Sequence, residues 1–237
     1  MVEAFRRAGL RLFVAYYRRG LARFLKAKEL VETGRLGRVT GVTYRYAEPR
    51  HRHVKPERLE WRLIASESGG GVFMDLGSHA LDILDFIVGP LAGVKGAAAN
   101  LASPYDVEDA VAMQFRTESG ALGTASWNFA SAARSDLIEV SGTDGRVSLS
   151  VFETEPVRLE TQEGEETFDL PNPPHVQQPL IQTIVDELRG RGRCPSTGES
   201  AARTARLMDS CLEGYYGTRA GEFWKRPDAW PGRRARP

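Results

Sequence analysis

Apolar residues recur at helical spacing in five segments of the chain. Each segment predicts an amphipathic helix, because residues three and four apart share one face of a helix. Glycines follow the first two segments, at Gly9 and Gly34, as is typical of helix C-termini. The five segments are residues 1–9, 21–33, 72–88, 177–188 and 200–216. In the fourth, the residues expected to face the interior are Leu180, Ile181, Ile184, Val185 and Leu188.

Alternating or short continuous apolar runs predict strands. Residues 39–46 are typical of an edge or half-buried strand. The clearest further strands are 94–101, 110–116, 122–129 and 137–141, followed by the shorter segments 146–151, 157–161 and 167–170. Short turns between neighbouring strands favour antiparallel hairpins. The pattern predicts an α+β fold, with a mostly antiparallel, open-faced sheet of about six strands and helices on one face.

The other face of this sheet is either solvated or paired with a second copy. Ala125, Trp127 and Phe129 alternate along residues 122–129, which is more apolar than a solvated sheet face normally is. We therefore expect a homo-oligomer that associates through the open sheet face.

The N-terminal region ends in a continuous apolar run, residues 12–16 within the segment 10–17. Such a run suits a strand buried on both faces in a parallel sheet. A parallel strand needs neighbours that residues 1–9 do not supply, so this start resembles the end of a βαβ domain. Tyr16, Tyr17, Arg18 and Arg19 lie at the carboxyl end of the strand, where ligands collect in such sheets. Alternatively, the arginines form a salt bridge at the domain junction.

The composition describes an ordinary globular protein, with 41% hydrophobic and 27% charged residues among 237. A net charge of +1 gives no electrostatic case for nucleic acid or a membrane surface as a partner. No apolar run is long enough to span a bilayer, and the N-terminus lacks the apolar core of a signal peptide. Two cysteines make no disulfide framework, so a cytoplasmic location is expected.

The stretch 68–79 combines glycines, a carboxylate and an imidazole. If the segment after the glycines is helical, Asp75 and His79 lie one turn apart on one face. An imidazole can take up a proton near neutral pH because its pKa is ordinarily about 6.5, and Asp75 can either orient the substrate hydroxyl or raise the basicity of His79. The alternative is a capping aspartate and a histidine with satisfied polar atoms. Asp82 lies on the same helix face as Asp75 and His79 and is expected to be solvated or hydrogen-bonded to an arginine.

Other polar residues are candidates for ligand binding. Trp61 and Arg62 suit a sugar site, since aromatic faces stack on sugar rings and arginine donates to hydroxyls; the alternative is a tryptophan that packs between domains. His175 either reaches the same cleft or caps the helix at 177, and we favour the cap. A metal site at His51 and His53 is disfavoured because the surrounding loop is basic.

Four stretches, in this order, resemble the Gfo/Idh/MocA oxidoreductases, which include glucose–fructose oxidoreductase and inositol dehydrogenases. They are residues 13–19, 26–37, 61–62 and 69–79, with further likeness at His175, Gln178, Pro179 and 195–198. The resemblance implies an N-terminal Rossmann domain with a glycine-rich dinucleotide fingerprint and a Glu-Lys-Pro motif. Neither motif occurs in this sequence.

The resemblance also implies a division of the chain. Residues 1–17 correspond to the end of the Rossmann domain and 18–224 to a substrate-binding and oligomerisation domain, while 225–237 is expected to be a frayed tail. Asp75 and His79 would lie beside the nicotinamide of NAD or NADP in the full-length family. This chain alone is not expected to bind the dinucleotide, because the phosphate-binding helix end is absent.

These observations predict the C-terminal substrate domain of an NAD(P)-dependent oxidoreductase that acts on a sugar, cyclitol or related polyol. Asp75 and His79 are the expected proton-handling pair. The candidates for substrate binding are Tyr17, Arg18, Trp61, Arg62 and His175, and those for cofactor binding are Tyr17 and Arg19. The alternative is a catalytically inert module, truncated or encoded by a split gene, that binds ligand or dimerises.

Overall fold

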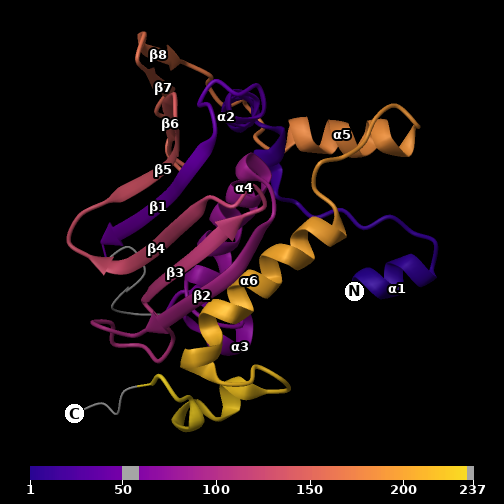
Figure 1. Ribbon diagram of the computed structural model, residues 1–237. Helices are drawn as coiled ribbons and strands as arrows, with labels where there is room; N and C mark the ends of the chain where they lie inside the picture. The colour runs from indigo at the N-terminus through magenta and orange to yellow at the C-terminus, as the bar shows by residue number, and fades with distance from the viewer. Residues whose placement is uncertain (50–58, 234–237) are drawn as a thin grey trace.

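The computed structural model describes residues 1–49 and 59–233 (Figure 1). Within these residues, eight strands form one sheet in the order β2-β3-β4-β1-β5-β6-β7-β8. The strands are β1 (Val39–Pro49), β2 (Leu91–Ala99), β3 (Ala110–Thr117), β4 (Leu122–Ser131), β5 (Ser135–Gly142), β6 (Gly145–Leu149), β7 (Val157–Thr161) and β8 (Gly164–Phe168). Neighbouring strands are antiparallel except β1 and β4, which are parallel. The sheet is thus larger than the six strands expected, and mixed.

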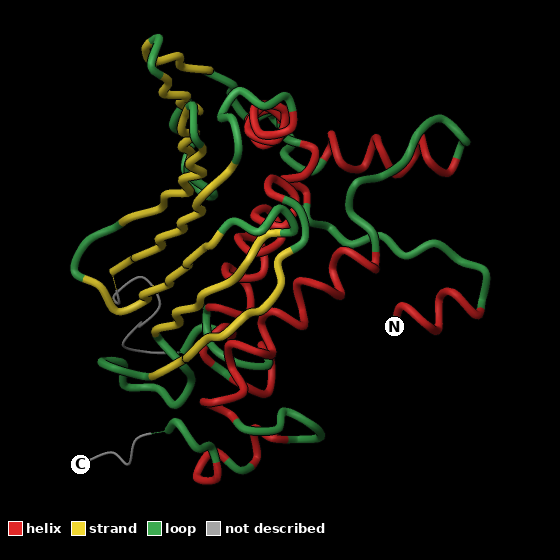
Figure 2. The backbone as a smooth tube through the Cα atoms, in the orientation of Figure 1, coloured by secondary structure: helices red, strands yellow, loops and turns green. Residues whose placement is uncertain are grey.

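Five of the helices fall on or close to the predicted segments, and the short helix Ala65–Ser68 was not predicted. The helices are α1 (Val2–Arg7), α2 (Ala22–Glu32), α3 (Ala65–Ser68), α4 (Ser78–Val88), α5 (Gln178–Leu188) and α6 (Gly198–Tyr216). α2 packs against β6 and β7, and α4 and α6 pack against β2. α1 and α5 lie on the side of these helices that is away from the sheet (Figure 2). No helix in the described part of the chain is both long and apolar enough to cross a membrane.

β1 lies inside the sheet, between β4 and β5. Its residues alternate in burial, with Val42, Tyr44 and Tyr46 inside and Thr43 and Arg45 exposed. The half-buried prediction is confirmed and the edge position is wrong. Alternation reports that one face is covered, and it carries no information about which strands pair on either side.

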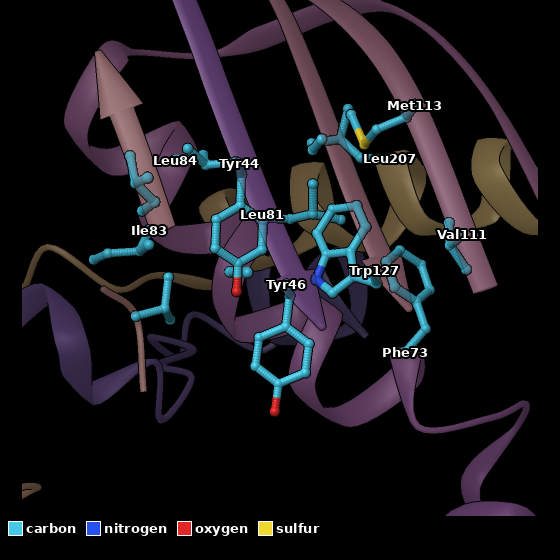
Figure 3. Close-up of a cluster of buried hydrophobic side chains, with 14 of the residues drawn as sticks. Tyr44, Tyr46, Phe73, Leu81, Ile83, Leu84, Val111, Met113, Trp127 and Leu207 are labelled. Atoms are coloured by element: carbon cyan, nitrogen blue, oxygen red, sulfur yellow. The ribbon is translucent and has the colours of Figure 1, made fainter. Parts of the chain in front are cut away.

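The core lies between the sheet and the helices (Figure 3). Trp127 is 1% exposed, and its ring meets those of Tyr44 at 5.4 Å and Phe73 at 4.8 Å. Trp127 and its neighbours Ala125 and Phe129 therefore face the helices, and the prediction that they make the open face apolar is wrong. The helix layer covers the apolar side, as the cost of exposing it requires.

The open face carries mainly polar and small side chains instead, with Leu122 as a 58% exposed apolar residue among them. Thr43, Thr124 and Gln114 lie side by side across β1, β4 and β3, and all three are exposed. Towards the other edge, Arg146 on β6 bonds Glu139 on β5 and Glu160 on β7. Hydroxyl, amide and charged groups keep this face compatible with water.

The predicted strand at residues 10–17 does not form. Phe13 makes a single antiparallel bridge to Thr197, and Tyr17–Gly20 is a 3-10 turn. A strand needs hydrogen-bonding neighbours, and within the described residues this segment has only the one bridge. The N-terminal segment is thus an extended connection from α1 to the helix layer.

Two further expectations differ from the structure. On α5 only Leu180 is buried, while Ile181 is 51% and Leu188 is 64% exposed, so the predicted inner face is only partly covered in this chain. Of the tail expected to fray, residues 234–237 lie outside the described residues, and the part before them is anchored by one buried side chain. Trp230 is 5% exposed, and its indole N–H donates to the Phe223 carbonyl at 3.1 Å.

Candidate functional site

The glycine stretch leads into a π-turn, not directly into an α-helix. α3 ends at Gly69 with φ +78°, a left-handed conformation that glycine adopts without strain. Residues Phe73–Gly77 then form one π-turn, and α4 continues from Ser78. The ring of Phe73 occupies the space where a Cβ on Gly77 would lie, at 2.2 Å. Such turns are rare and often mark functional sites.

Asp75, on this π-turn, is held by an arginine from an earlier segment. Arg62 Nε donates to Asp75 Oδ2 at 2.5 Å, and its guanidinium lies 4.8 Å from the Trp61 ring centre. Both residues belong to the 3-10 turn Trp61–Leu63. The structure thus joins three of the predicted site residues, and the Trp61 ring, 45% exposed, does not pack inside this chain.

His79, one turn later on α4, is enclosed by aromatic rings. Tyr16 and Tyr17 contact it edge-on, with ring centres 5.5 Å and 5.8 Å away. Its Nδ1 is buried and has no hydrogen-bond partner. Burial and the positive charge of Arg18 lower the pKa of His79 to about 4, although Asp75 acts in the opposite direction. Asp75 thus acts on the pKa of His79 in the expected direction but is outweighed, and the imidazole is neutral at pH 7.

Arg18 approaches the same group from the 3-10 turn. It is 7% exposed, Nε donates to the Val151 carbonyl at 3.0 Å, and the guanidinium lies between the rings of Tyr17 and Phe152 at 4.8 Å and 4.5 Å. Burial lowers the pKa of Arg18. Its Nη1 is buried without a partner. Two buried nitrogen atoms without partners, His79 Nδ1 and Arg18 Nη1, therefore belong to residues that both contact the Tyr17 ring.

Arg19 forms a buried charge cluster next to this group. Its Nε and Nη2 each bind the Asp82 carboxylate at 2.8 Å, Nη1 donates to the Pro195 carbonyl at 2.9 Å, and Nη2 lies 3.3 Å from Asp85. Arg203 on α6 binds Asp85 at 2.7 Å. The expected Asp82–arginine bond is confirmed. Burial raises the pKa of Asp82 to about 6 despite these bonds.

The remaining candidates stand apart from this cluster. His175 is exposed, and its backbone carbonyl accepts the N–H of Gln178 at 3.0 Å, without a side-chain cap on α5. Among described residues it makes no hydrogen bond or ring contact with the Asp75 and His79 group. His51 and His53 lie outside the described residues. Among the residues that the structure describes, no cluster of three potential metal ligands occurs.

Sequence reasoning missed Asp85, Arg203 and the buried Glu108. Asp85 follows Asp82 by one helical turn, so their shared face was a usable signal. Tyr16 was expected at the ligand-collecting end of a strand but was given no role of its own. Nothing local to Glu108 distinguishes it from a solvated acidic residue.

Comparison with known proteins gives one consistent result, a family of oxidoreductases. The GFO/IDH/MocA C-terminal domain matches residues 24–148, more than half of the 237. "Oxidoreductase P35" of Formosa agariphila is 30% identical over 212 residues, covering 88% of this chain and 64% of its own. The 1,5-anhydro-D-fructose reductase of Ensifer adhaerens is 28% identical over 205 residues, covering 84% and 60%.

Solved structures share the fold. The WlbA dehydrogenase of Bordetella pertussis, in complex with NADH and UDP-GlcNAcA, superposes with a TM-score of 0.69 at 25% identity, covering 90% of this chain and 63% of its own. The chain thus spans less than two thirds of the length of these relatives. Because the domain match covers residues 24–148, more than half of this chain, the chain belongs to the Gfo/Idh/MocA family.

Proposed function

We propose that this chain is the substrate-binding part of an NAD(P)-dependent oxidoreductase that acts on a sugar, cyclitol or related polyol. The observation that carries the proposal is the pair of buried polar atoms without partners, His79 Nδ1 and Arg18 Nη1, on two residues that both contact Tyr17. Each such atom costs about 1–3 kcal/mol when it is left unpaired. A polyol offers adjacent hydroxyls that pair with both, and the relatives named above support a sugar-like substrate.

In this proposal His79 handles the proton of the reacting hydroxyl. The neutral imidazole accepts the proton at Nδ1, and its low pKa makes the protonated form a ready donor in the reverse, carbonyl-reducing direction. Arg62 holds Asp75 by its Oδ2 atom. The other carboxylate oxygen of Asp75 accepts a hydrogen bond from a substrate hydroxyl and orients it. Tyr17 and Arg18 line the opposite side of His79 and exclude water from it. A bound nicotinamide supplies the hydride acceptor or donor.

The described residues fit only the nicotinamide end of such a cofactor, beside Tyr17 and His79. Among residues 1–49 and 59–233, no glycine-rich turn connects a buried strand to a helix N-terminus, which is where a pyrophosphate binds. Arg19 donates to Asp82, Asp85 and Pro195 inside the protein. We therefore reassign Arg19 from cofactor binding to positioning of the turn that carries Tyr17 and Arg18.

A second candidate is an inert binding or association module, and one observation favours it. Ile181 and Leu188 on α5 are largely exposed, so part of an apolar helix face is uncovered in this chain.

Association of copies through the open sheet face is compatible with either candidate. That face holds a hollow of about 500 Å³ lined in part by Thr43, Gln114 and Thr124. Light scattering of the wild type and a Thr124→Arg variant tests it: only the wild type should be oligomeric.

Ligand binding separates the two candidates. The chain is titrated calorimetrically with a panel of sugars, cyclitols and polyols, and separately with NAD(H) and NADP(H). We expect at least one polyol to bind, weak or absent dinucleotide binding, and loss of polyol binding in His79→Ala but not in His175→Ala. No polyol binding, or equal binding by His79→Ala, would refute the substrate-domain proposal.

A further inference from the structure

Glu108 is a fully buried carboxyl that the proposed chemistry does not use. It lies just before β3 and is 0% exposed. One carboxylate oxygen, Oε2, accepts the backbone N–H of Gly71 at 2.8 Å and the hydroxyl of Tyr216. The other, Oε1, is buried without a partner. Burial raises the pKa of Glu108 to about 7 against these hydrogen bonds.

The glycine stretch approaches Glu108 so closely that no side chain fits. A Cβ on Gly71 would lie 2.4 Å from the Glu108 carbonyl oxygen and 2.8 Å from its Cδ. The contacting oxygen is backbone and cannot rotate away. The glycine stretch, the start of β3 and the last residue of α6, Tyr216, therefore meet at one carboxyl group.

Hydrogen bonds continue from this point to the acid–base pair. The Gly71 carbonyl accepts Met74 N at 3.0 Å, and the Val72 carbonyl accepts Asp75 N at 3.1 Å. The Asp75 carbonyl in turn accepts the hydroxyl of Ser78 at 2.7 Å. The position of Gly71 thus sets where the π-turn begins, and with it the places of Asp75 and His79.

We propose that Glu108 is a positioning residue that anchors Gly71 and thereby places Asp75 and His79 relative to Arg62 and Tyr17. That this positioning matters for catalysis rests on the proposed function, whereas the effect of Glu108 on the position of Asp75 and His79 does not. An apolar residue would fill the same space without the penalty of burying a carboxyl. A carboxyl also supplies what an apolar residue lacks, which is one oxygen that holds two donors from separate elements.

The titration of His79, followed by NMR of its imidazole, reports the placement without any substrate. In Glu108→Ala, loosening of the π-turn exposes His79, and its pKa should rise by about 1 unit or more from about 4 towards 6.5. Glu108→Gln keeps an oxygen acceptor and should stay close to the wild type. The matched control is Leu159→Ala, a buried position on β7 towards the other edge of the sheet, which should lower stability and leave the His79 titration unchanged.

Tyr216→Phe keeps the ring and removes one donor, and it serves if Glu108→Ala does not fold. Its His79 pKa should also rise, by less. An unchanged titration in Tyr216→Phe and Glu108→Ala, or an equal shift in Leu159→Ala, overturns the positioning role. Polyol binding by the wild type is measured separately, so that its absence refutes the proposed function and leaves the titration result to decide on Glu108.

Discussion

Acidification should destabilise this protein through His79. The pKa of His79 is lowered from 6.5 to about 4, so the folded state binds this proton more weakly than the unfolded state does. The stabilisation is therefore complete above pH 6.5 and is lost as the pH falls towards 4. A difference of about 2.5 units corresponds to about 3.4 kcal/mol, of which about 3 kcal/mol is lost by pH 4.

Urea unfolding at pH 7.5 and pH 4 measures this loss in the wild type, in His79→Gln and in His175→Gln. Other groups titrate over the same range, so the quantity that matters is the difference between variants. The free energy of unfolding should fall by about 3 kcal/mol more in the wild type than in His79→Gln. His175→Gln controls for the loss of an exposed imidazole. Parallel losses in the wild type and His79→Gln would refute the buried, neutral state of His79.

Three further outcomes are expected. Arg19→Met should lower the free energy of unfolding by about 3–5 kcal/mol in urea titrations, because Asp82 is left as an uncompensated buried charge. Gly142→Ala should lower it by about 1–3 kcal/mol, since the new Cβ would lie 2.0 Å from the Leu36 carbonyl oxygen, while Gly41→Ala, with open space around it, should not. Trp61→Ala should weaken polyol binding in calorimetry with little change in Tm, because the ring is 45% exposed; a large drop in Tm would show that Trp61 is structural.

Much of the fold is readable from local patterns, and what is missed is non-local. The alternation of Ala125, Trp127 and Phe129 correctly indicates one buried face of β4. Whether helices or a second subunit cover that face is decided by distant segments, and the interpretation failed there. The continuous apolar run before Tyr17 was likewise predicted to be a strand, and it is not one, because a strand forms only where neighbouring strands supply hydrogen bonds.

For the site, the spacing of Asp75 and His79 needed the glycine stretch and Trp61–Arg62 beside it before it favoured a functional pair, and the structure brings Arg62 and Asp75 into contact. The π-turn was not predictable, since Phe73 and Leu76 fit an α-helical period equally well. The pKa of His79 depends on burial by Tyr16 and Tyr17 and on a cation from Arg18, which the chain brings together only by folding. Electrostatic surroundings are a tertiary property, so sequence reasoning could name the effect of Asp75 but not the larger, opposite effects of burial and Arg18.

The interior position of β1 makes the sheet a single cooperative unit. β2, β3 and β4 form one antiparallel meander and β5 to β8 another, and β4 and β5, although consecutive, are separated by β1. Each meander can form from local hairpins, but they join only when a strand from about 80 residues upstream inserts between them. Amide hydrogens in β1 should therefore exchange with solvent only when the whole molecule unfolds, and the insertion of this strand is expected to be the slow, committing step of folding.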